Sequence, residues 1–183
     1  PFTDEDKAKI EEEMKKIIGL VASLTIIAGV CAEKNKLVNE ITAEPIKETA
    51  KANEMAAVRA VMPAGVEQVE ARGETFVGKN AQGETIGYAA KGKDGGGYGG
   101  DIVLMVGFER DKKTLVCYKT LAASETPGLG MKLNAPEFAG QFRGKDATTL
   151  RLKKKGGDIE AITAATITSK AVLKAVADAQ KHL

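Results

Sequence analysis

The stretch Glu160-Ala161-Ile162-Thr163-Ala164-Ala165-Thr166-Ile167-Thr168-Ser169 places four hydroxyl side chains within seven positions, directly before an amphipathic segment. The apolar residues of that segment recur at the spacing of a helix, namely at Val172, Leu173, Val176, Ala179 and Leu183. Thr168 or Ser169 is therefore predicted to cap the N-terminus of a last helix. Because a helix N-terminus carries unpaired N–H groups and a partial positive charge, this position suits a phosphate group. The pattern by itself also fits a plain hydroxyl-rich cap that binds no ligand.

Two glycine-containing loops accompany this stretch. In Glu125-Thr126-Pro127-Gly128-Leu129-Gly130, the proline fixes one backbone angle and the two glycines let the backbone approach a ligand, although the residues also fit a β-turn without one. The second loop, Gly97-Tyr98-Gly99-Gly100-Asp101-Ile102, precedes an apolar strand. Rossmann and P-loop nucleotide sites need a glycine-rich loop that opens a helix, so neither is indicated here.

Together, the three stretches resemble the motifs of one family, which contains the G subunit of the Rnf complex and the C subunit of the sodium-pumping NADH:quinone reductase. The likeness extends from about residue 14 to the end of the chain. In that family, the Thr after the Ala of the motif carries FMN through a phosphoester bond, and this position is Thr166 here. The chain departs from the motif at two positions, because Glu160 stands where the family has Asp and Ala164 where it has Gly.

The resemblance implies a function as well as a cofactor. It implies a membrane-anchored electron-transfer subunit of an ion-translocating ferredoxin:NAD oxidoreductase, the Rnf complex, with FMN bound covalently to Thr166. Such a subunit carries electrons and has no substrate of its own. The implied partners are the other membrane subunits of that complex and a flavin transferase. The implied cofactor-binding residues lie in the three stretches: Thr166, Thr163, Ala165, Thr168, Glu125, Thr126, Gly128, Leu129, Gly130 and Tyr98.

Three alternatives stay open. A non-redox structural subunit would keep the fold and lack covalent flavin, because Glu160 and Ala164 would prevent attachment. The equivalent subunit of the sodium-pumping NADH:quinone reductase shares the motifs, but the form of the Glu125–Gly130 loop and the short chain resemble the Rnf subunit more closely. A free periplasmic protein that holds FMN non-covalently is the third.

The expected fold is α+β, with an N-terminal membrane helix followed by an FMN-binding domain whose antiparallel sheet is flanked by helices. We expect a charged helix at residues 1–16, a membrane anchor at 17–38 and the FMN-binding domain at 39–183. The anchor contains the apolar run Ile17–Ala32, which also fits a buried soluble helix or a signal sequence. A lysine pair precedes this run, and the positive-inside rule then predicts a single-pass protein of the cell membrane with its C-terminal domain on the extracytoplasmic side.

The residues between the anchor and the last helix predict a meander of antiparallel strands. The strands are expected at Thr75–Val77, Thr85–Ala90, Ile102–Phe108 and Thr114–Thr120, with an edge strand at Thr148–Leu152. The glycine-rich stretch Gly92–Gly100 is expected to be irregular. Residues 39–63 predict a helix that continues the anchor or begins just after it, and Asn134 is expected to cap a short helix at Ala135–Phe142.

Composition excludes several classes of function. The formal net charge is +2 and aromatic residues make up 4% of the chain, so neither a basic block nor a stacking surface indicates nucleic acid. His182 is the single histidine and the second-last residue, so a histidine-based metal site is not available and a hydrolytic triad is not favoured. The two cysteines, Cys31 and Cys117, do not make a disulfide framework.

Overall fold

The first element of the computed structural model is one long helix. Helix α1 runs from Asp4 to Val61, over 58 residues. The structure describes residues 3–183, without the side chains of residues 5 and 6, so residues 1–2 of the predicted helix 1–16 lie outside it. The helix continues through residues 16 and 38, and Pro45 lies inside it. The chain divides into two compact units, residues 1–50 and residues 51–183, and α1 contributes to both.

The first unit is helical throughout its described residues from Asp4 to Ala50. Its large apolar side chains are exposed, and they include Ile17, Ile18, Leu20, Val21, Leu24, Ile26, Ile27 and Val30. By length and composition, α1 is one helix that is long and apolar enough to cross a membrane, and none of its most apolar stretch is buried inside the structure.

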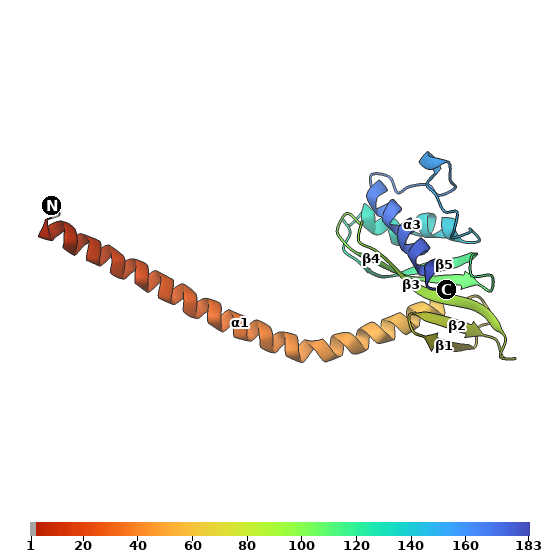
Figure 1. Ribbon diagram of the computed structural model, residues 1–183, viewed down its shortest axis with the longest axis horizontal. Coiled ribbons are helices and arrows are strands. Elements are labelled where there is room, and N and C mark those ends of the chain that lie inside the picture. The colour runs from red at the N-terminus through yellow and green to blue at the C-terminus, as the bar shows by residue number, and fades with distance from the viewer. Residues whose placement is uncertain (1–2) are drawn as a thin grey trace. The chain divides into compact units, whose positions relative to one another are not determined.

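The second unit is built on a five-stranded antiparallel sheet in the order β1-β2-β3-β4-β5 (Figure 1). The strands are β1 (Gln68–Arg72), β2 (Thr75–Lys79), β3 (Thr85–Asp94), β4 (Ile102–Glu109) and β5 (Leu115–Ala123). Each strand pairs with the next one along the chain, so the predicted antiparallel meander is confirmed. The prediction that Gly92–Gly100 is irregular is wrong at its start, because β3 stays paired with β4 as far as Asp94 and Ile102.

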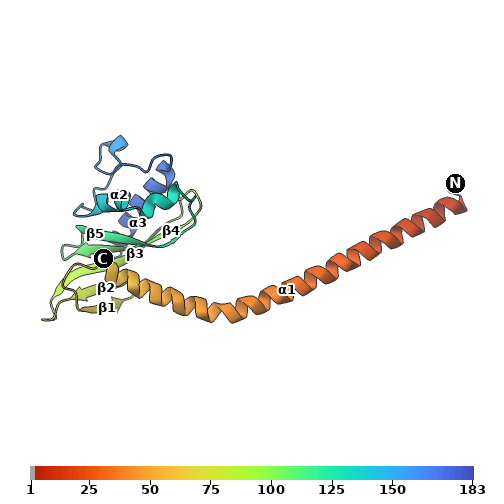
Figure 2. The ribbon, with the colours of Figure 1, turned by 180° about the vertical axis from the view of Figure 1, so that it is seen from behind.

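Both faces of the sheet are covered, because neighbouring residues of a strand point to opposite sides. Helix α3 (Thr166–Lys181) packs on one face, where its Val172 and Val176 join Leu104 and Val106 in the larger core. The view from behind shows α3 and the short helix α2 (Pro136–Ala139) on this same face (Figure 2). Strand β4 is accordingly buried on both sides, as its continuous apolar run predicts.

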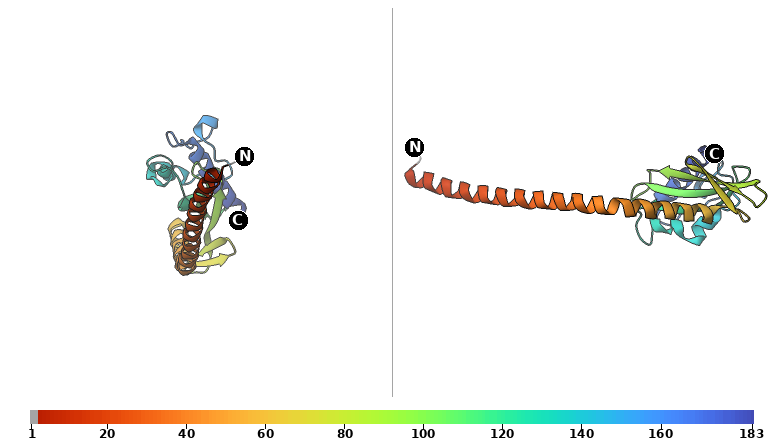
Figure 3. Two further views of the ribbon diagram at one scale, coloured as in Figure 1. Left: turned by 90° about the vertical axis from the view of Figure 1, so that its left-hand side faces the viewer. Right: turned by 90° about the horizontal axis from the view of Figure 1, so that it is seen from below.

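The last turns of α1 cover the opposite face of the sheet. Ala57, Val58, Val61 and Met62 form a second buried cluster with Phe76, Ala89 and Met105. The view from below shows this end of α1 beside the strands (Figure 3). At the contact, the backbone of Val61 lies so close to Gly107 of β4 that a Cβ atom at Gly107 would clash with the Val61 carbonyl group. The helix backbone therefore touches the sheet directly.

Two predicted elements differ from the structure between β5 and α3. The predicted helix Ala135–Phe142 is the short helix α2 followed by a 3-10 turn, η2 (Gly140–Phe142). Its N-cap is Ala135 and not Asn134, because Pro136 occupies the first turn and has no N–H that needs capping. The predicted edge strand Thr148–Leu152 is also wrong: Leu152 makes only an isolated bridge with Ile159, and a 3-10 turn, η3 (Lys153–Lys155), follows it.

The buried Tyr118 of β5 should lower the stability of the folded protein at high pH. Its hydroxyl donates to the Leu133 carbonyl oxygen in η1 (Gly130–Asn134) at 2.5 Å, and burial raises the pKa of Tyr118 well above its ordinary value of 10.0. Above pH 10, Tyr118 loses its proton in the unfolded chain but keeps it in the folded protein. The free energy of unfolding is therefore unaffected by Tyr118 below pH 10 and falls by about 1.4 kcal/mol for each pH unit above it. Urea unfolding of the full chain between pH 9 and 11 measures this slope. Burial also raises the pKa of the Cys117 thiol above its ordinary value of 9.0, so Cys117 adds a loss of the same sign in this window. Tyr118→Phe should therefore lower the slope above pH 10 by about 1.4 kcal/mol per pH unit, and an unchanged slope in that variant would assign the slope to another group.

Candidate functional site

A pocket of about 510 Å³ opens where three loops of the second unit meet. Its walls come from the glycine-rich loop before β4, the loop after β5 and the start of α3. Ala164 and Ile167 line it together with eight of the predicted site residues: Tyr98, Glu125, Thr126, Leu129, Gly130, Ala165, Thr166 and Thr168. The volume lies within the range of about 300–1,000 Å³ that is typical of ligand pockets.

Two predicted site residues lie outside the lining of this pocket. Gly128 is an exposed turn residue with φ +74°, so it shapes the loop that Glu125 begins. Thr163 lines a different pocket, together with Gln141 and Glu160. The structure therefore brings the three sequence stretches together but separates Thr163 from Thr166.

The carboxylate of Glu125 joins all three walls of the pocket. One oxygen, Oε1, accepts the backbone N–H of Tyr98 at 2.8 Å and that of Gly99 at 3.5 Å. The other oxygen, Oε2, accepts the hydroxyl of Thr168 at 3.0 Å. The Glu125 side chain is 7% exposed, so these three hydrogen bonds replace most of its contact with water. Glu125 thus holds together Tyr98, which lies 27 positions before it in the sequence, and Thr168, which lies 43 positions after it.

Helix α3 begins earlier than its sequence predicts. Its first residue is Thr166 and its N-cap is Ala165, whose side chain cannot accept a hydrogen bond. The prediction that Thr168 or Ser169 is the N-cap is therefore wrong. Both side chains are buried inside the first turn: Thr168 donates to Glu125, while the Ser169 hydroxyl donates to the Ala165 carbonyl and accepts the N–H of Ile162.

The start of α3 fits a phosphate group. No side chain caps the helix, and the first N–H groups of any helix have no acceptor within the helix itself. The half-buried Thr166 is the first residue of this turn and lines the pocket. A phosphate on its hydroxyl would lie beside those N–H groups and the positive end of the helix dipole. The residues present therefore suit the phosphate of a nucleotide such as FMN.

Ala164 adopts a backbone conformation that favours glycine. Its φ is +61°, in the left-handed region where an L-residue with a Cβ atom is strained. The family motif that this stretch resembles has a Gly at this position. Ala164 therefore keeps the backbone path that a glycine would give, at the cost of strain.

This strain gives a prediction for Ala164→Gly. Removing the strain of an alanine in the left-handed region should stabilise the folded protein by about 1–2 kcal/mol. The greater conformational freedom of glycine in the unfolded chain should lower that gain by about 0.4–1 kcal/mol. We expect the variant to be more stable by about 1 kcal/mol in thermal or urea unfolding of the full chain. Ala165→Gly is the matched control, because Ala165 has φ −131° and should lose stability on the same change. Equal effects at the two positions would contradict the strain.

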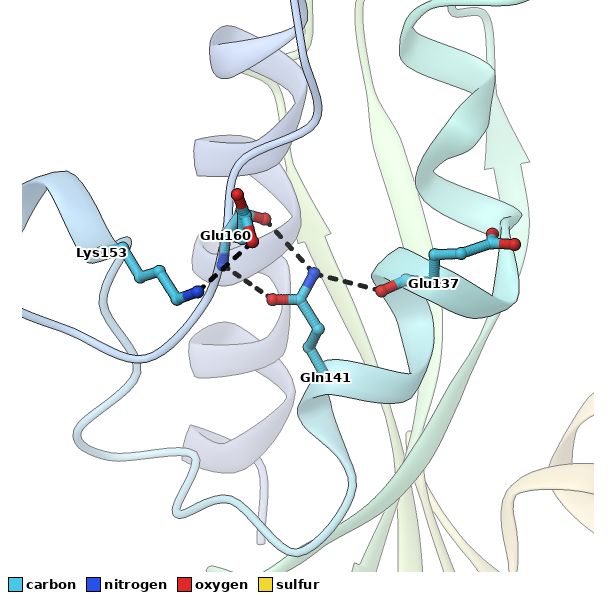
Figure 4. A network of polar contacts seen from close by, with 4 residues as sticks. All are labelled: Glu137, Gln141, Lys153 and Glu160. Carbon is cyan, nitrogen blue, oxygen red and sulfur yellow. Dashed lines mark hydrogen bonds and ion pairs between the residues drawn. The ribbon is translucent and has the colours of Figure 1, made fainter.

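Glu160 stands at the start of the motif and is anchored through its backbone. The side-chain amide of Gln141 accepts the Glu160 N–H at 2.7 Å and donates to the Glu160 carbonyl at 3.4 Å and to the Glu137 carbonyl at 3.2 Å (Figure 4). The Glu160 carboxylate instead pairs with Lys153 at 3.3 Å, and both side chains are exposed. An exposed pair of this kind contributes about 0–1 kcal/mol, so the Glu160 carboxylate is accessible to another protein.

The chain is similar to several known proteins. A family model described as an FMN-binding domain matches residues 97–181. The chain is 30% identical over 197 residues to the G subunit of the Na(+)-translocating ferredoxin:NAD(+) oxidoreductase complex of Acetobacterium woodii, covering 94% of each chain. It is 29% identical over 182 residues to the G subunit of the ion-translocating oxidoreductase complex of Methanosarcina acetivorans, covering 93% of this chain and 96% of that one. Among solved structures, NqrC of Shewanella oneidensis is similar with a TM-score of 0.47 and 17% identity, covering 62% of this chain and 64% of that one.

Proposed function

Because this chain belongs to the G-subunit family of ion-translocating oxidoreductase complexes, it is an electron-carrier subunit with an FMN-binding domain, and we propose that it carries FMN covalently on Thr166. FMN supplies the redox chemistry, since it accepts and releases electrons, and the protein supplies position and electrostatics. The observation that carries the proposal is the position of Thr166, on the first turn of an uncapped helix and in the wall of the pocket.

Different residues of the pocket would bind different parts of the cofactor. Thr166 Oγ1 would become the bridging oxygen of the phosphoester. The flavin transferase would supply a flavin dinucleotide, whose phosphoanhydride bond breaks as the new O–P bond forms, so that a nucleoside monophosphate leaves and the proton of the Thr166 hydroxyl passes to solvent or to that leaving group. The first N–H groups of α3 neutralise the phosphate. Thr126, Leu129, Gly130 and Tyr98 line the pocket and would form the wall beside the ring system. Thr168 acts through Glu125, because its hydroxyl already donates to that carboxylate.

The rest of the chain provides attachment to the membrane. Helix α1 carries exposed apolar side chains over residues 17–32, and we assign residues 17–38 to the anchor, with residues 1–16 before it and the FMN-binding domain at 39–183. The exposed apolar side chains need a lipid environment or neighbouring membrane subunits. The lysine pair before the anchor supports an extracytoplasmic domain. The partners are then the other membrane subunits of a ferredoxin:NAD oxidoreductase of the Rnf type, with the flavin transferase as a transient partner.

One specific observation favours covalent attachment over the alternative of a flavin-free structural subunit. Ala164 keeps a left-handed backbone angle although it is not a glycine, so the departure from the motif at this position leaves the path of the chain into α3 intact. The departure at Glu160 is conservative in charge, and its carboxylate is exposed. A transferase that recognises the backbone conformation before α3 and an acidic side chain at position 160 could therefore still bind this chain.

The test is the intact mass of the full chain produced together with a flavin transferase and purified in detergent, followed by peptide mapping of residues 156–170. We expect the mass to include one FMN phosphoester, and we expect the modified peptide to carry it on Thr166. Protein that stays unmodified beside an active transferase would favour the structural subunit. Flavin that is released on denaturation would instead favour a non-covalent FMN-binding protein.

A further inference from the structure

Glu125 is a buried carboxylate that the proposed attachment chemistry does not use. Its side chain is 7% exposed, and it takes part in none of the ion pairs formed among residues 3–183. Its hydrogen bonds come from two backbone N–H groups and one hydroxyl group. A carboxyl group without a cationic partner among the described residues therefore lies in the wall of the pocket.

The surrounding loops are fitted to this carboxylate. A Cβ atom on Gly130 would clash with Glu125 Oε2, and a Cβ atom on Gly97 would come within 2.8 Å of Glu125 Oε1. Two glycines on two different walls thus leave the space that the carboxylate occupies. The loop that bears Tyr98 is otherwise rich in glycine and has little structure of its own, so its hydrogen bonds to Glu125 fix its position relative to α3.

We propose that Glu125 is a positioning residue that ties the glycine-rich loop to the first turn of α3, and that its fixed charge lowers the reduction potential of the bound flavin. The inference rests on the proposed function, since it concerns the pocket in which the flavin is held. Thr166 and Glu125 line the same pocket. Reduction adds electrons to the flavin, and a negative charge held nearby in a poorly solvated wall opposes that addition.

The charge and the contacts can be separated by substitution. In Glu125→Gln, the amide oxygen can take the place of Oε1 and keep the N–H groups of Tyr98 and Gly99, while the amide NH₂ donates to the Thr168 hydroxyl, which can also accept. The charge is lost and the three contacts are kept. In Glu125→Ala, both are lost. Glu109→Gln is the matched control for charge, because Glu109 is exposed at the far end of β4, about 24 Å along the strand from Ile102.

The first measurement is the reduction potential of the flavin-loaded full chain in detergent. We expect Glu125→Gln to favour the reduced flavin about tenfold, which is a rise of about 30 mV for a two-electron couple. Glu109→Gln should leave the potential unchanged. A potential in Glu125→Gln equal to that of the Glu109→Gln control would overturn the role of the charge.

The second measurement is amide hydrogen exchange of the full chain without flavin, produced without the transferase. We expect peptides that cover residues 95–101 to exchange at least tenfold faster in Glu125→Ala than in the unaltered chain, and Glu125→Gln to stay close to the unaltered chain. Unchanged exchange in Glu125→Ala would overturn the positioning role. Absence of flavin from the unaltered chain would defeat the proposed function, whereas this exchange measurement would still decide whether Glu125 ties the two walls.

Discussion

Replacing Thr166 by valine is expected to abolish covalently bound flavin and to leave the fold unchanged. Valine keeps the shape of the side chain and removes its hydroxyl oxygen, which is the bridging atom of the proposed phosphoester. The Thr166 hydroxyl makes no hydrogen bond within the described structure of residues 3–183, so its loss should change stability by less than about 0.5 kcal/mol. Flavin fluorescence of the denatured protein on a gel measures the attachment, and thermal unfolding measures the fold.

Thr163→Val is the matched control for this variant. Thr163 belongs to the same stretch and is exposed, but it lines a different pocket from Thr166. We expect this variant to keep full flavin fluorescence. Flavin that persists in Thr166→Val and disappears in Thr163→Val would move the attachment to Thr163 and contradict the proposed site. Loss in both variants would indicate that the transferase reads the whole hydroxyl-rich stretch and not one acceptor.

The parts of the site that could be predicted are those encoded by neighbouring residues. The turn chemistry of Pro127, the glycines around Tyr98 and the hydroxyls before α3 are local patterns, so their loops could be located without the fold. The alternating and continuous apolar runs likewise indicated the strands that became β2 to β5. What these patterns share is that each depends on spacing within about ten residues.

The parts that could not be predicted depend on contacts between distant residues. Thr168 is a residue type that often caps helices, yet its hydroxyl donates a hydrogen bond to Glu125, which lies 43 positions earlier in the chain. The left-handed φ of Ala164 follows from the path of the chain into α3 and has no signal in its own side chain. Gly92 had the composition of a loop, but it lies in β3, where α3 packs so closely that a Cβ atom would clash with Ala175 and Ala179. No local pattern reveals that a helix will lie there.

The same kind of close contact gives the largest expected effect on stability, at Gly107. In Gly107→Ala, the new Cβ atom would clash with the carbonyl carbon and oxygen of Val61, which are backbone atoms at the end of α1 and cannot rotate away. The last turn of α1 must then lift from the sheet, and Val58, Val61 and Met62 lose part of their buried contact. We expect a loss of about 3 kcal/mol, or about 10 °C in Tm, in unfolding of the full chain in detergent.

Gly140→Ala is the control that separates this clash from the general effect of adding a methyl group. Gly140 has helical backbone angles, φ −63° and ψ −22°, and a Cβ atom there would meet nothing within 4 Å, so the variant should be neutral or slightly more stable. If Gly107→Ala were equally neutral, the end of α1 would not be packed on β4 as described. A large loss confined to Gly107 would instead mean that the domain needs the helix from Ala57 onward. A fragment that begins at residue 63 would then expose the second core and fold poorly, whereas one that begins at residue 51 would keep it.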